Sequence, residues 1–148
     1  MERKHRKLHL VLFCLYSGFM LYLLFNRAGG IEGMNYWTQI RANLNLEPFH
    51  TIRLFLKVLN NQTYSSTAFI NLGGNVILFI PLGFFLPRVF PCLQKFGRAI
   101  LTTTLIITAV ELTQLFTLLG SCDIDDLILN LSGMVVGYLI FMIFKKQR

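Results

Sequence analysis

Four long apolar runs, separated by polar stretches, dominate the pattern of this chain. They cover about residues 8–25, 68–90, 99–119 and 127–144. Each is close to the ~20 residues that cross a hydrocarbon core about 30 Å thick. Because that core holds no water, each run must satisfy its own backbone hydrogen bonds, as a helix does. The pattern predicts an all-α protein, with residues 1–148 forming one domain, a four-helix transmembrane bundle.

Basic residues gather at the ends of these runs and predict how the chain is oriented. They cluster in the first seven residues, between the second and third runs, and in the last four residues. An even number of spans puts these three segments on one side of the membrane, and the positive-inside rule assigns that side to the cytoplasm. We therefore predict a multi-pass membrane protein with cytoplasmic N- and C-termini.

Composition further narrows the class of protein to which this chain can belong. Hydrophobic residues make up 54% of the chain, more than a soluble domain usually contains. The net charge of +7 lies at the span ends, where cations meet anionic headgroups, and not in a basic and aromatic array that would grip nucleic acid. The cysteines lack the spacing of a metal site. We predict no nucleic-acid partner, no metal and no cofactor.

The connection over residues 26–67 is longer than a simple loop needs, and its second half is patterned. The apolar positions at helical spacing are Phe49, Ile52, Phe55, Leu56 and Leu59, and the basic positions opposite them are His50, Arg53 and Lys57. Pro48 suits a first helical turn. We predict an amphipathic helix in the outer interface, with Arg53 and Lys57 toward the headgroups. Packing of this helix on the bundle, with its charged face in water, is the alternative.

Polar side chains occupy the outer half of three neighbouring runs. The residues predicted to bind a ligand are Asn71, Asn75, Glu111, Gln114, Asp123, Asp126 and Asn130. Asn71 and Asn75 are four residues apart and share a helix face. Glu111 lies inside the third run, about 12 Å of helix rise from its outer end at ~1.5 Å per residue. Ionisable groups inside a span usually mark a functional site.

A structural role explains part of this pattern equally well. Asp123 suits a helix N-cap, and Asp125 and Asp126 suit the positive end of a helix dipole. The amides could join helix to helix through hydrogen bonds. Capping does not account for Glu111, because it lies within a run, so Glu111 is the strongest functional candidate.

Small residues and prolines predict where helices approach or bend. Gly133 and Gly137 form a small-residue face that lets two helices pack closely, and a homodimer could use it. Pro81 removes a backbone donor and predicts a kink in the second span, which Gly83 also thins. Pro87 predicts the end of that span.

Several segments, in order, resemble the VanZ family of bacterial membrane proteins. They are residues 75–84 (NVILFIPLGF), 111–116 (ELTQLF) and 123–130 (DIDDLILN) with Gly133, and residues 45–49 (NLEPF) fit the Asn-Leu-x-Pro-Phe element that this family carries before its second core span. The resemblance covers about residues 43–138. It implies a cell-envelope protein associated with reduced susceptibility to teicoplanin, and it carries no catalytic mechanism.

The chain departs from this family at one place. Many members have an arginine just before the Asp-x-Asp-Asp run, where this chain has Gly120-Ser121-Cys122. If that arginine pairs with a substrate anion, Arg53 or Arg41 would have to replace it here.

Three functions remain in competition. The favoured one is binding of a lipid-linked or amphipathic ligand in the outer leaflet, with membrane lipids or a lipid-linked envelope precursor as partner, which would modulate glycopeptide and lipoglycopeptide susceptibility. An intramembrane enzyme could use several carboxylates for Mg²⁺ or acid–base chemistry, yet no nucleophile motif is present and no catalytic residue is assigned. A small ion-coupled transporter could use Glu111 as a proton carrier.

Overall fold

Four long helices form the body of the protein. The computed structural model describes residues 2–26, 30–58 and 65–146. The long helices are α1 (Glu2–Phe25), α4 (Ser65–Val89), α5 (Phe96–Thr117) and α6 (Ile124–Lys146). Each is long and apolar enough to cross a membrane. The predicted all-α class with four candidate spans is therefore confirmed.

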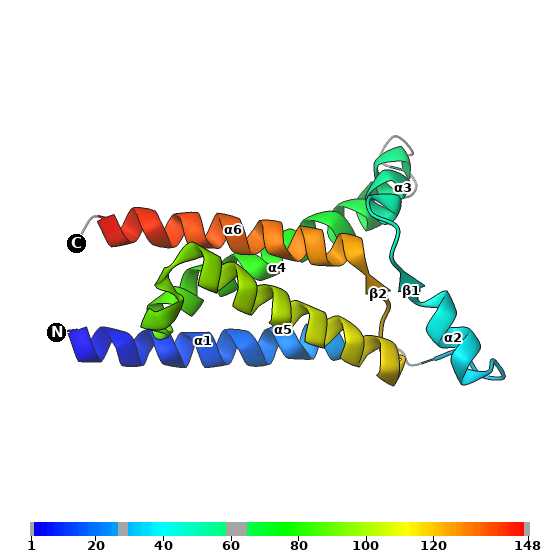
Figure 1. The fold of residues 1–148 in the computed structure, drawn as a ribbon, viewed down its shortest axis with the longest axis horizontal. Coiled ribbons are helices and arrows are strands. Elements are labelled where there is room, and N and C mark those ends of the chain that lie inside the picture. The colour runs from blue at the N-terminus through cyan, green and yellow to red at the C-terminus, as the bar shows by residue number, and fades with distance from the viewer. Residues whose placement is uncertain (1, 27–29, 59–64, 147–148) are drawn as a thin grey trace.

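The two ends of the bundle differ in what they carry. Figure 1 shows the N- and C-termini at one end, here called the terminal end. The turn between α4 and α5, which contains the 3₁₀ helix η1 (Pro91–Gln94), lies at that end too. The opposite end, here called the loop end, carries the short elements α2 (Tyr36–Ala42), β1 (Leu44–Asn45), α3 (His50–Val58) and β2 (Cys122–Asp123). The described parts of the three basic segments thus lie at one end.

Helices α4 and α6 make the closest contact in the bundle. A Cβ atom on Gly133 would collide with the backbone carbonyl of Val76, and one on Gly137 with that of Ile80. Gly83 faces the backbone of Met134 equally closely. Only glycine allows two backbones to approach in this way. The small-residue face therefore contacts α4 of the same chain.

The helix boundaries correct three details of the sequence prediction. Pro87 lies inside α4, which continues to Val89, so this proline does not end the span. Pro48 lies before α3 and not in its first turn. Leu118 adopts a left-handed conformation with φ 58° that ends α5 at Thr117. Glu111 is consequently about 9 Å of helix rise from the end of α5, closer than the predicted 12 Å.

The loop end also contains a short helix and a two-stranded sheet that hydrophobic periodicity did not reveal. Helix α2 has seven residues and begins where the Asn35 side chain accepts the backbone N–H of Trp37 at 2.9 Å. Strands β1 and β2 pair in parallel, with Asn45 opposite Asp123. Both elements are too short to show a repeat, and the strand pairing joins segments far apart in sequence.

Candidate functional site

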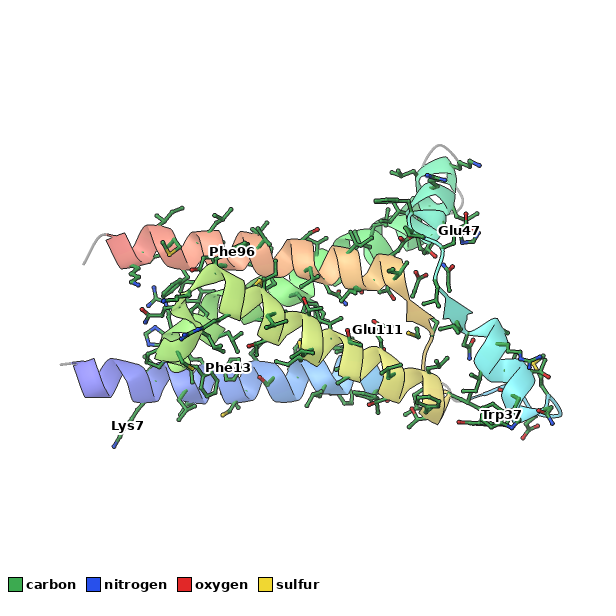
Figure 2. All side chains as sticks on the ribbon, viewed as in Figure 1. Lys7, Phe13, Trp37, Glu47, Phe96 and Glu111 are labelled. Carbon is green, nitrogen blue, oxygen red and sulfur yellow. The ribbon has the colours of Figure 1, made fainter. Side chains whose placement is uncertain are left out.

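Four carboxylates meet at the loop end, where α5 approaches the start of α6. This acidic node consists of Glu111, Asp123, Asp125 and Asp126. The exposed fraction is 7% for Glu111, 8% for Asp123 and 0% for Asp125. Figure 2 shows Glu111 on the side of α5 that faces α6. Carboxylates removed from water to this degree require hydrogen-bond donors, and the structure shows where many of these come from.

Asp123 connects α6 to the loop that precedes α3. Its Oδ1 accepts the backbone N–H of Asp125 at 2.9 Å, so it caps α6 as the sequence indicated. Its Oδ2 accepts the Thr51 hydroxyl and the Asn45 side-chain amide, the latter at 3.1 Å. One carboxylate thereby fixes the start of α6, strand β1 and the first turn of α3.

Asp125 holds the start of α3 in a similar way. Its two oxygens accept the backbone N–H groups of Phe49 and Ile52, the second at 3.0 Å. These donors have no acceptor within α3, because they lie at its N-terminal end. Phe49 has φ 64°, a left-handed conformation that is strained for an aromatic residue and that the bond to Asp125 helps to maintain.

No sequence pattern singled out Asp125 as a candidate binding residue. Its partners lie 76 and 73 residues earlier in the chain. They are backbone groups, which every residue except proline possesses. The signal that pointed to Asp125 was its membership in the acidic run.

Glu111 and Asp126 complete the node from neighbouring helices. Glu111 Oε2 accepts the backbone N–H of Asp123 at 3.3 Å, and Asp126 Oδ1 accepts the Asn75 amide. Glu111 therefore contacts the N-terminal end of α6, although it lies on α5. This bond goes to the residue that precedes α6, so it links α5 to β2.

The remaining predicted residues lie outside this node. Gln114 donates to the carbonyl of Leu24 at 2.7 Å and ties α5 to α1. Asn130 is 3% exposed, and its Oδ1 has no hydrogen-bond partner. The side chain of Asn71 lies outside the described part of the chain. The structure thus brings together Asn75, Glu111, Asp123 and Asp126, and adds Asp125.

The node has a negative electrostatic environment. The donors named above are backbone N–H groups, a hydroxyl and amides, all of them neutral. Burial, together with the charges of Glu111, Asp123 and Asp126, raises the pKa of the nearby Cys122 thiol. Among the described residues, no group of three or more His, Cys, Asp or Glu side chains is arranged to hold a metal ion.

A second charged region lies on the outward side of α3. This basic face consists of His50, Arg53 and Lys57, all exposed. With Glu47 and Leu54 they line a groove of about 200 Å³. The opposite side of α3, with Ile52 and Phe55 half-buried, packs toward the bundle. Helix α3 therefore packs on the bundle with its charged face outward.

Comparison with known proteins identifies the family. The family model described as VanZ/LLP1 matches residues 13–145. The chain belongs to the VanZ/LLP1 family. Searches of curated proteins and of solved structures found no match. The VanZ/LLP1 match covers all four carboxylates of the node and the basic face, and with the four apolar helices it makes this chain a multi-pass membrane protein.

Proposed function

We propose that this VanZ/LLP1 protein binds a lipid-linked or other amphipathic ligand at the outer leaflet of the bacterial plasma membrane and thereby modulates susceptibility to glycopeptide and lipoglycopeptide antibiotics. In this proposal the terminal end, with its basic segments, lies in the cytoplasm. The loop end then faces the cell envelope, where such ligands are found.

The observation that carries this proposal is the separation of charge at the loop end. The carboxylates of the acidic node accept hydrogen bonds from neutral groups within the fold. Arg53 and Lys57 of the basic face remain exposed beside a groove. An exposed cation near a membrane surface attracts anionic headgroups, with an effect of about 1 kcal/mol for each Lys or Arg.

The surroundings of the basic face suit a ligand that is part polar and part apolar. Leu54 and Leu56, on the same short helix, are 53% and 52% exposed. A helix with cations and exposed leucines near a membrane surface can contact headgroup and chain together. The ligand contacts that we propose therefore lie on α3, and the acidic node supports α3 without touching the ligand.

A susceptibility test separates these two roles. A strain lacking the protein would be complemented with wild type, Arg53→Gln/Lys57→Gln or Glu111→Gln, at membrane levels matched by immunoblot. We expect wild type and Glu111→Gln to restore tolerance to teicoplanin and daptomycin, because a glutamine oxygen can still accept the Asp123 N–H. The double variant on α3 should not restore it.

Lys95→Gln provides a matched control, since Lys95 is an exposed cation at the terminal end, away from the groove. It should behave as wild type. Full tolerance with Arg53→Gln/Lys57→Gln would contradict the proposal. Loss of tolerance with Glu111→Gln alone would move the ligand site to the acidic node.

A further inference from the structure

We infer that the groove on α3 binds a phosphate group that carries a neighbouring hydroxyl or amine, and that Glu47 selects for that neighbouring donor. The inference rests on the proposed function and names the chemistry of its ligand. It concerns two classes of headgroup that have the same charge and differ only in hydrogen-bond donors.

The cations in the groove are spaced to share one phosphate. Arg53 and Lys57 are four residues apart, about 6 Å along the helix axis at ~1.5 Å per residue. His50 lies one turn before Arg53 on the same face, and all three line the groove. An arginine fork binds phosphate oxygens through paired hydrogen bonds, and a lysine adds a flexible point charge.

Glu47 gives the same groove an acceptor. Among the described residues it is the acid that lines this groove, and its side chain is exposed. Figure 2 shows it beside α3 at the loop end. Its backbone N–H donates to Asn45 Oδ1 at 3.2 Å, and its carbonyl accepts the His50 N–H at 3.3 Å. The turn that begins α3 therefore fixes its place at the rim.

A carboxylate beside phosphate-binding cations affects which phosphate ligands the groove favours. An ionised Glu47 only accepts hydrogen bonds, so it repels a bare phosphate. It favours a phosphate whose substituent presents a hydroxyl or an amine, because that group can donate to the carboxylate. Sugar phosphates and phosphoglycerol headgroups have this chemistry, whereas a simple alkyl phosphate does not.

Native mass spectrometry of the full chain in detergent tests this with two lipids. Phosphatidylglycerol carries the phosphate and hydroxyl groups, and phosphatidylmethanol carries the same charge without hydroxyl groups. We expect the wild type to bind phosphatidylglycerol about fivefold more tightly, as one exposed, charge-assisted hydrogen bond would give. Glu47→Ala should bring this ratio to about one and strengthen the binding of phosphatidylmethanol.

Substitution of either cation should weaken the binding of both lipids equally. Arg53→Gln and Lys57→Gln should each weaken binding of both lipids by about fivefold, and Lys95→Gln, at the terminal end, should weaken neither. Displacement of bound phosphatidylglycerol by millimolar glycerol 3-phosphate would support the same chemistry with a soluble source. Failure of glycerol 3-phosphate to displace it would support a lipid source.

Two results would overturn the inference: equal wild-type affinity for the two lipids, or binding that is insensitive to Arg53→Gln and Lys57→Gln. Equal affinities together with loss of antibiotic tolerance in the α3 double variant would refute the selectivity and leave the proposed function standing. Selective lipid binding with unchanged tolerance would refute the proposed function and leave the selectivity standing.

Discussion

The acidic node and the basic face lie at the same end of the bundle, and they differ in every physical respect. Three of the four carboxylates in the node are buried, and the node accepts hydrogen bonds from four segments of the fold. The basic face is exposed and lines a groove. The carboxylates of the acidic node, which are rare beside apolar segments, accept hydrogen bonds that join elements of the fold. The cations of the basic face, Arg53 and Lys57, are exposed, and in our proposal they contact the ligand.

The two regions differ because water solvates one and not the other. Removing a partner from a buried carboxylate network leaves a polar group without water, which costs about 1–3 kcal/mol for each unsatisfied group. An exposed lysine or arginine loses little when its neighbour changes, since water replaces the contact. Substitutions in the node should therefore change stability, and those on the basic face should change binding.

The largest expected effect is that of Asp125→Ala. It leaves the N–H groups of Phe49 and Ile52 without their acceptors, so we expect a loss of about 2–5 kcal/mol in stability. Asp125→Asn keeps one acceptor oxygen and should lose roughly half as much. Thermal unfolding of the detergent-purified protein measures both. A melting temperature unchanged by Asp125→Ala would mean that α3 is held in place by other contacts.

The next largest effect distinguishes the contribution of the Glu111 hydrogen bond from that of its charge. Glu111→Leu removes the acceptor for the Asp123 N–H and should destabilise the protein by about 1–3 kcal/mol. Glu111→Gln keeps an acceptor and should cost less than half of that. The same unfolding experiment compares them. Equal destabilisation by the two variants would show that the charge of Glu111, and not its hydrogen bond, matters for stability.

A smaller effect is expected in the alkylation rate of Cys122, whose thiol lies close to the negative charges of the node. Its raised pKa keeps the thiol protonated at neutral pH, so alkylation should be slow and should accelerate as pH rises toward that higher pKa. Asp126→Asn removes one of the charges and should speed alkylation at pH 8 by about twofold. Maleimide labelling would be followed in a Cys14→Ser/Cys92→Ser background.

The control for this measurement is Arg98→Gln, a charge change at the terminal end, which should leave the labelling rate unchanged. If Asp126→Asn has no effect on the rate, the charge of Asp126 does not contribute to the raised pKa of Cys122, and burial with Glu111 and Asp123 accounts for it.

The smallest expected effect on stability belongs to the basic face. Arg53→Gln and Lys57→Gln remove exposed charges, so the free energy of unfolding should stay within about 0.5 kcal/mol of wild type. Any loss of lipid binding in these variants can then be assigned to recognition. A marked fall in the melting temperature would show instead that these cations help to hold α3.

The sequence by itself determined the large features of this protein. Length and hydropathy gave four spans, because any segment that crosses a membrane needs about 20 apolar residues in a helix. Helical periodicity gave α3 and the separation of its basic face from its apolar face. The spacing of Gly133 and Gly137 indicated a close helix approach, and the ordered motifs indicated the family.

The tertiary structure alone decided which helices meet and where the carboxylates find their donors. Gly133 and Gly137 contact α4 of the same chain, where the sequence also allowed a second copy. Asp125 binds N–H groups in α3, and Glu111 contacts the start of α6. Backbone N–H groups are the same at nearly every residue, so no sequence pattern marks which carboxylate will reach the free ones at the start of a helix. Packing of the loop end brings the free N–H groups of α3 and α6 to the carboxylates.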